Sequence, residues 1–316
     1  VRSRRQRQMC IRDRCSTIQL NDPNQILEVL QTSLSKAMKE KRPATILIPS
    51  NFWNSEIILK EDKSFSILDE RIFNKKNHSG SNAESISDFL SNIDLSCPEK
   101  NLIIYGAELN SLTNRSSLNN LLQNKAVNFL GTPESKGFLD HSSPFFKGLI
   151  GIMETQDALQ YIDETKNIIF IGVKKNLMES FGLDAVLKNK TILTINEFEH
   201  YWDSIRSKNR CVSLNSCLAD SLKQLDSLIP NIAILDKIAS SHYEEIPKET
   251  FNLTSINKVI HNKLPPECDL FIDAGNTGAT AVHYLQPRGK NIFYISLGMG
   301  AMGNSIGTAI GSSIAD

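Results

Sequence analysis

The 316-residue sequence lacks the features that mark several specialised classes of protein. Its 16 glycines and 11 prolines are too few for a collagen-like chain, and its six cysteines are too few for a disulfide-dense one. No two cysteines have a CxxC or other common zinc or redox spacing, which favours reduced thiols and a cytoplasmic location. With 40% hydrophobic residues, the chain is not expected to be wholly disordered.

An excess of either charge is absent too, because 35 basic residues balance 35 acidic ones. Residues 1–14 hold six arginines and one aspartate, so the remainder has 29 basic and 34 acidic residues and a net charge of −5. This mildly acidic body argues against a nucleic-acid partner. Residues 1–14 have neither an apolar period nor a signal-peptide pattern, and we interpret them as a non-native basic head.

Residues 15–54 are interpreted as the C-terminal tail of a domain, because one helix and one strand cannot form a domain of their own. Asp22 and Pro23 form a typical helix start, and apolar residues then repeat at helical spacing through Lys39. The apolar run 44–49 predicts a buried strand. Residues 55–82 are polar and lack an apolar period, which predicts an interdomain linker.

Residues 83–230 are predicted to form a complete central domain. Apolar runs alternate here with helical patterns, which is typical of a parallel sheet in an α/β domain. Functional sites in such sheets lie beyond the carboxyl ends of the strands. The predicted strands are 102–106, 126–131, 167–172 and 191–195, and the predicted helices include 115–124 and 176–188.

The last segment, residues 231–316, starts another α/β unit. Its predicted elements are helix 253–263, strand 268–275, helix 277–285, strand 291–298 and helix 304–315. Because the sequence stops two strands into this sheet, we expect both ends of the chain to be cut. The predicted fold class is α/β, with a central parallel-sheet (Rossmann-like) domain flanked by two incomplete α/β domains.

A glycine-rich segment near the end fits a dinucleotide motif in part. Gly298, Gly300 and Gly303 have the GxGxxG spacing after a predicted strand. An acidic residue should follow about 20 positions later, but the chain ends first. On this interpretation the protein is an NAD-dependent dehydrogenase, and a non-catalytic nucleotide-binding module is a further alternative.

The same segment contains a GxxxG repeat. Gly303, Gly307 and Gly311 could place one face of a helix against another transmembrane helix. The stretch has too few large apolar residues for membrane insertion, so we expect no membrane association. We expect instead that this helix packs closely on a sheet or on another subunit.

Taken together, the loops resemble those of thiamine diphosphate-dependent enzymes of the acetolactate synthase and pyruvate oxidase group. The resemblance is carried by Asp273-Ala-Gly-Asn-Thr-Gly278 and by Ser296-Leu-Gly-Met-Gly-Ala-Met-Gly303. It extends upstream to Thr132-Pro-Glu-Ser-Lys-Gly-Phe-Leu-Asp-His141 and to Arg42-Pro-Ala-Thr-Ile-Leu-Ile-Pro49. These stretches occur in family order. The resemblance implies that 15–54 is the C-terminal tail of the pyrimidine-binding domain, that 83–230 is the central domain, and that 231–316 is the truncated N-terminal part of the thiamine diphosphate-binding domain.

The resemblance implies roles for individual residues. The cofactor-binding residues that it implies are Gly275, Asn276, Thr277, Gly298, Gly300, Ala301 and Met302. Asn276 and Thr277 would reach the diphosphate, although the family often has Gln-His there and Thr277 could instead cap the helix. Gly300 would offer its carbonyl to the aminopyrimidine. Met302 would be an apolar wedge under the bent cofactor, or else an ordinary core residue.

Further expectations follow from the same resemblance. Lys136 would face the substrate. The cofactors would be thiamine diphosphate and Mg²⁺, with FAD left open because the run at 102–109 has a single glycine. The activating glutamate would lie before this chain, and the Mg²⁺ ligands would follow Asp316, so no catalytic or metal-ligating residue is assigned within it.

The expected activity is that of the full-length parent protein. That parent would be a homodimeric or homotetrameric lyase or transferase that decarboxylates a 2-oxo acid, with acetolactate synthase-like carboligation as the most specific expectation. The chain itself holds half of the cofactor site and is expected to be inactive.

Overall fold

The computed structural model describes residues 16–40, 43–52, 54–57, 83–123, 125, 127–139, 141, 143–155, 157–197, 203–231, 252–265, 268–285, 293–297, 300 and 302–315. The chain divides into two compact units, Val1–Asn77 and His78–Asp316. Each unit is described by itself. Within the described residues, no helix combines the length and the apolar character needed to cross a bilayer.

The first unit is a small βαβ arrangement. Strand β1 (Ser16–Gln19) pairs in parallel with β2 (Ala44–Leu47), and α2 (Ile26–Glu40) connects them. The helical segment begins as predicted: the Asp22 carboxylate accepts a 3.0 Å hydrogen bond from the Asn24 amide, and a proline follows at the first position of the 3-10 turn η1 (Pro23–Gln25). A further 3-10 turn, η2 (Ser50–Phe52), follows β2.

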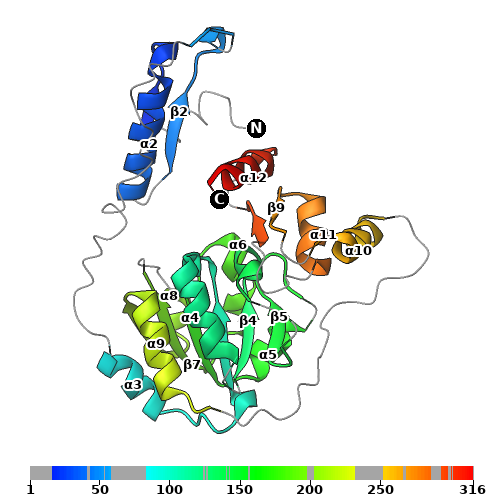
Figure 1. Ribbon diagram of the computed structural model, residues 1–316. Helices are drawn as coiled ribbons and strands as arrows, with labels where there is room; N and C mark the ends of the chain where they lie inside the picture. Colours follow the sequence, from blue (N-terminus) through cyan, green and yellow to red (C-terminus); the bar gives the residue numbers. More distant parts are fainter. Residues whose placement is uncertain are drawn as a thin grey trace. The chain divides into compact units, whose positions relative to one another are not determined.

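The second unit is built on a six-stranded sheet in which all paired neighbours are parallel (Figure 1). The strand order is β5-β4-β3-β6-β7-β8. The chain therefore starts in the middle, at β3, builds one half of the sheet, and returns to build the other. The strands are β3 (Asn101–Tyr105), β4 (Asn128–Gly131), β5 (Phe146–Leu149), β6 (Asn167–Ile171), β7 (Thr191–Asn196) and β8 (Arg210–Asn215).

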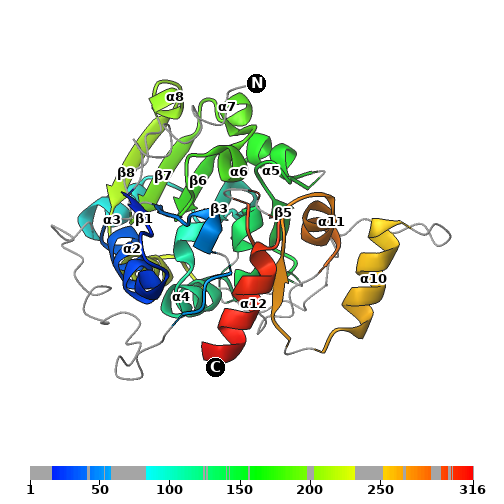
Figure 2. The same cartoon turned by 90° about the horizontal axis from the view of Figure 1, so that it is seen from above.

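Both faces of this sheet are buried, which is why the predicted strands appear as continuous apolar runs. Along β3, Ile103 and Tyr105 belong to one core, whereas Leu102 and Ile104 belong to the other. The first core takes side chains from α3 (Ala83–Ser91), α4 (Leu112–Gln123) and α9 (Leu218–Leu228). The second takes them from α5 (Ala158–Glu164), α7 (Leu183–Val186) and α8 (Asp203–Arg206), and Figure 2 shows these helices on the opposite side of the sheet from α3 and α4.

The four predicted strands of the central sheet are confirmed, and β5 and β8 are additional. The helix predicted over 176–188 is wrong as a single element. Two short helices replace it, α6 (Leu177–Ser180) and α7, because Gly182 between them has a left-handed φ of 81°. Short 3-10 turns complete the unit: η4 (Pro98–Lys100), η5 (Ala107–Leu109) and η6 (Pro133–Phe138).

The C-terminal elements form a two-stranded parallel sheet with its helices. They are α10 (Leu253–Lys263), β9 (Leu270–Ile272), α11 (Asn276–Tyr284), β10 (Phe293–Ile295) and α12 (Asn304–Ala315). All five agree with the predicted order. Val282, Phe293 and Ile295 share a core with α4 and α9, so these elements pack on the central sheet within one compact unit. The predicted boundary at residue 230 stays a prediction.

Candidate functional site

The two glycine-rich loops meet at the carboxyl edge of the β9–β10 sheet. Asp273 follows β9, and its carboxylate accepts hydrogen bonds from the amides of Gly303 (2.7 Å) and Ser305 (2.8 Å) at the start of α12. These bonds stabilise the charged form and lower the pKa of Asp273. The aspartate therefore ties together two segments that lie 30 residues apart in the sequence. Asp273 lies within the predicted loop motif, but its sequence context predicted no role for it.

The start of α11 is open to solvent. Gly275 is its N-cap residue and makes no side-chain capping bond, so the alternative in which Thr277 caps this helix is wrong. Asn276 and Thr277 occupy the first two helical positions, and both are exposed. Amides in the first turn of a helix have no acceptor within it, and together with the helix dipole they favour an anion.

The second loop presents a glycine backbone and an exposed methionine. Gly300 has a left-handed φ of 61°, a conformation that residues with a side chain rarely adopt. Met302 is 93% exposed, so the alternative in which it is a core residue of this chain is wrong. The wedge role stays a prediction. Gly298 and Ala301, the other two predicted cofactor-binding residues of this loop, lie outside the described residues.

The exposure of Met302 predicts how the fold responds to its loss. Met302→Ala should change the free energy of unfolding by no more than about 0.5 kcal/mol, as for other surface changes. The matched control is Ile295→Ala in the neighbouring strand, where the side chain is 3% exposed. That change should cost about 2–5 kcal/mol, because it leaves a cavity in the core. Urea unfolding of both variants measures the difference, and a comparable loss for Met302→Ala would show that its side chain is buried in solution.

No residue of helix α12 is buried. Ile306, Ile310 and Ile314 are exposed and lie one helical turn apart. A Cβ atom added at Gly303, Gly307 or Gly311 would have no neighbour within 4 Å among the described residues. The predicted close packing of the GxxxG face is therefore not formed within the part of the chain that the structure describes.

Lys136 does not face a substrate space. It lies in η6, is 0% exposed, donates a hydrogen bond to the Val282 carbonyl in α11 and lies 5.4 Å from the centre of the Phe293 ring. Burial lowers its pKa from 10.5 to about 7. The prediction of a substrate-facing lysine is corrected for this chain, because η6 packs on β10 so closely that a Cβ added at Gly137 would lie 2.5 Å from the Phe293 Cβ.

A buried imidazole lies in the same region. His141 stacks on Phe146 with ring centres 3.9 Å apart, and its Nε2 lies 3.3 Å from the Tyr105 hydroxyl. Burial and the nearby Lys136 ammonium lower its pKa well below the usual value. This neutral, packed histidine has a structural role beneath η6.

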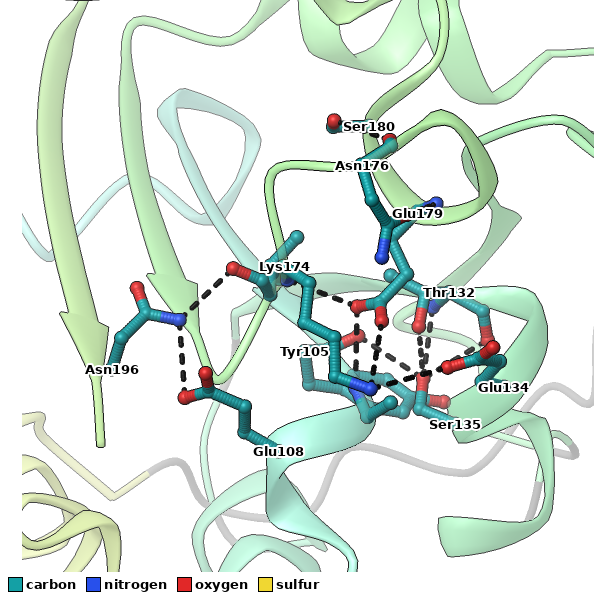
Figure 3. Close-up of polar contacts among 12 residues, drawn as sticks. Tyr105, Glu108, Thr132, Glu134, Ser135, Lys174, Asn176, Glu179, Ser180 and Asn196 are labelled. Carbon is teal, nitrogen blue, oxygen red and sulfur yellow. Dashed lines mark hydrogen bonds and ion pairs between the residues drawn. The ribbon is translucent and has the colours of Figure 1, made fainter. Parts of the chain in front are cut away.

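A second polar cluster lies at the carboxyl ends of β3 and β6 and was not predicted (Figure 3). The Lys174 ammonium lies between two carboxylates, 3.4 Å from Glu134 and 3.8 Å from Glu179. Glu179 is 0% exposed, and burial raises its pKa to about 7. Nearby, the Glu108 carboxylate accepts hydrogen bonds from the Glu197 amide (2.9 Å) and the Asn196 side chain (3.3 Å).

The described residues contain no group of three or more His, Cys, Asp or Glu side chains placed to hold a metal ion. Their cysteines, Cys97, Cys211, Cys217 and Cys268, are all free thiols, in agreement with the prediction for these four. Within the described part of the chain, the candidate site therefore consists of the two loops at the β9–β10 edge, without metal ligands.

Comparison with known proteins supports this fold. No family model matches the chain, and no curated protein matches it. Among solved structures, the chain is similar to a Rhodococcus jostii RHA1 thiamine diphosphate-dependent 4-hydroxybenzoylformate decarboxylase, with 11% sequence identity and a TM-score of 0.54. The match covers 89% of this chain and 52% of that one, so the chain spans about half of the enzyme's length. The chain thus shares its fold with half of a thiamine diphosphate-dependent decarboxylase, which confirms the predicted α/β fold class.

Proposed function

We propose that this chain belongs to a longer thiamine diphosphate-dependent enzyme that decarboxylates a 2-oxo acid. The observation that carries the proposal is the pair of Asp273 hydrogen bonds to Gly303 and Ser305, which fixes both glycine-rich loops at one sheet edge. The fold shared with a thiamine diphosphate-dependent decarboxylase supports it. Thiamine diphosphate supplies a carbon nucleophile and an electron sink for the loss of CO₂.

The start of α11 fits the diphosphate. The exposed Asn276 and Thr277 bring side-chain donors to a helix N-terminus, where backbone amides also favour an anion. The Asp273 carboxylate accepts hydrogen bonds from the amides of α12, which reduces its repulsion of a diphosphate at the start of α11. In this role Asp273 is a positioning residue, which holds the second loop beside the first.

The second loop fits the other end of the cofactor. The surroundings of Gly300, which has a left-handed backbone, are open, since among the described residues an added Cβ would meet only Ala274, at 4.0 Å. A planar ring could therefore approach the backbone and donate a hydrogen bond to the Gly300 carbonyl. The exposed side chain of Met302, two residues after Gly300, would contact the cofactor as an apolar support.

The NAD-dependent alternative is disfavoured by the same geometry. In a dinucleotide fingerprint, the pyrophosphate binds the N-terminal amides of the helix that follows GxGxxG. Here that helix is α12, and the amides of Gly303 and Ser305 already donate to Asp273. A pyrophosphate would have to displace this carboxylate.

The narrower parts of the proposal concern the parent protein. We propose acetolactate synthase-like carboligation as its reaction, Mg²⁺ as the second cofactor, and a homodimer or homotetramer as its assembly. The exposed isoleucines of α12 support an assembly, since an apolar row of this kind is typical of a surface that another chain covers. The activating glutamate and the Mg²⁺ ligands would come from segments outside this chain.

An assay of CO₂ release tests the proposal. The full-length protein that contains residues 15–316 should release CO₂ from a 2-oxo acid only with thiamine diphosphate and Mg²⁺, whereas residues 1–316 alone should not release CO₂. Replacing Asn276 and Thr277 together by alanine should weaken thiamine diphosphate binding at least about tenfold, since hydrogen bonds to a charged group contribute about 1.5–3 kcal/mol each.

Ser313→Ala, at the far exposed end of α12, is the matched control and should leave the cofactor affinity unchanged. Oxidation of a substrate with NAD, or CO₂ release that does not require thiamine diphosphate, would contradict the proposal.

A further inference from the structure

The central sheet has the strand order of a dinucleotide-binding domain. From one edge to the other its strands follow the order β5-β4-β3-β6-β7-β8. The order in which strands are added to the sheet therefore reverses between β3 and β6, although the two strands are parallel. In open parallel sheets, ligands bind beyond the carboxyl ends of the strands at this reversal, and a dinucleotide places its pyrophosphate against the backbone that follows the first strand. In this chain the corresponding backbone is Gly106–Ala107, directly after β3.

Two backbone amides converge at this position, one from each half of the sheet. The Ala107 amide follows β3, and the Lys174 amide follows β6. Both donate to the same atom, Oε2 of Glu179, at 3.3 Å and 3.1 Å. A carboxylate oxygen shared by two converging amides is bound in the same way as an oxygen of a phosphate group.

The space around this carboxylate is filled. A Cβ added at Gly106 would lie 2.5 Å from the Gly172 carbonyl oxygen and 2.6 Å from Glu179 Oε2. In a dinucleotide site, a glycine at this position lets a phosphate approach the backbone. Here Gly106 lets the Glu179 carboxylate approach the backbone instead. Because Glu179 is 0% exposed, no room for a second anion is left at these two amides.

Local contacts hold Glu179 in place. The Asn176 side chain caps α6 by accepting a 2.8 Å hydrogen bond from the Glu179 amide. The Lys174 ammonium lies 3.8 Å from the other carboxylate oxygen, Oε1. Glu134 and Glu108 add two further carboxylates to the same edge of the sheet. An incoming dinucleotide would therefore meet an occupied amide pair and acidic neighbours.

We propose that the amides of Ala107 and Lys174 form an anion site which the chain fills with its own Glu179 carboxylate, so that the central domain takes neither a flavin nor a nicotinamide dinucleotide. This inference is independent of the thiamine diphosphate proposal, because it concerns a different sheet and different residues. FAD, which the sequence leaves open as a cofactor, is therefore not expected to bind the central domain.

Titration with FAD, NAD and inorganic pyrophosphate tests the inference, with the backbone amides of Ala107 and Lys174 followed by NMR. In the wild-type chain, neither amide resonance should move with any of the three probes. In Glu179→Ala the vacated site should bind pyrophosphate, with a dissociation constant at least about tenfold lower than any weak binding by the wild type. Glu134→Ala removes a neighbouring carboxylate without freeing the amides, and it should behave as the wild type.

Each other outcome overturns the inference. Saturable binding of FAD or NAD that shifts these two amides in the wild type would show that the site is open. A folded Glu179→Ala chain whose amides ignore pyrophosphate would show that they do not form an anion site. If Glu179→Ala does not fold, Glu179→Ser replaces it, since its short side chain also vacates the position of the carboxylate, and the same gain or lack of gain decides.

Discussion

Replacing Lys136 by methionine is expected to raise the free energy of unfolding at pH 7 by roughly 1–3 kcal/mol. Lowering a lysine pKa from 10.5 to about 7 on folding destabilises the folded state by about 4 kcal/mol at pH 7. Methionine removes this cost and keeps most of the side-chain volume. The loss of the hydrogen bond to the Val282 carbonyl offsets part of this gain, since a hydrogen bond to a charged group contributes about 1.5–3 kcal/mol.

The pH dependence gives this prediction a distinctive signature. Between about pH 7 and pH 10.5, the unfolded chain binds a proton on Lys136 that the folded chain does not, so the stability of the wild type rises with pH. Relative to Lys136→Met, the wild type should gain about 2 kcal/mol between pH 7 and about pH 9. The Lys136 ammonium also lowers the pKa of His141, but burial holds that pKa well below its usual value and thus below this pH range. The other groups with shifted pKa values are present in both proteins, so the difference between pH 7 and pH 9 reports on Lys136.

Lys147→Met is the matched control, measured by urea unfolding at the same pH values. Lys147 also donates to a carbonyl, that of Pro144 at 2.9 Å, and lies 5.3 Å from the centre of the Tyr161 ring, but it is only partly buried. Its replacement should change the stability by less than about 1 kcal/mol, because water still solvates the ammonium. A Lys136→Met chain that is less stable than the wild type at pH 7, with an unchanged pH slope, would refute the buried lysine.

The strands that could be predicted from the sequence are the fully buried ones. Strands β3 and β6 are buried along their whole length, so their sequences are continuous apolar runs that are easy to find. Strand β8 is at an edge and mixes Arg210 and Ser213 with apolar residues, and β5 contains Lys147 and Gly148. Neither has the continuous apolar run that identifies a buried strand, so both were missed.

At the candidate site too, only local features could be predicted from the sequence. Loop motifs identified Asn276, Thr277 and Gly300, because their residue types and spacing are local features of the sequence. The roles of Asp273 and Glu179 depend on partners 30 and 72 residues away, and no local pattern reveals such contacts. Lys136 was predicted to face the substrate because of the family resemblance alone; only the packing of η6 on β10 shows that it is buried.

The second large effect concerns the protection of the two loops by the cofactor. If thiamine diphosphate binds at the start of α11 and beside Gly300, its diphosphate accepts hydrogen bonds from backbone amides that are otherwise open to solvent. Exchange of those amides with deuterium should then slow strongly, since each opening must first break a charge-assisted hydrogen bond. The cluster around Glu179 gives an internal reference, because its amides already have an acceptor in the chain.

Hydrogen–deuterium exchange of the full-length protein, with and without thiamine diphosphate and Mg²⁺, tests whether the cofactor binds at the start of α11. The proposed cofactor site predicts that amides within 275–278 exchange at least about tenfold more slowly with the cofactor, while those within 107–109 and 174–179 are unchanged. Protection confined to 107–109 and 174–179, or no protection at 275–278, would contradict it.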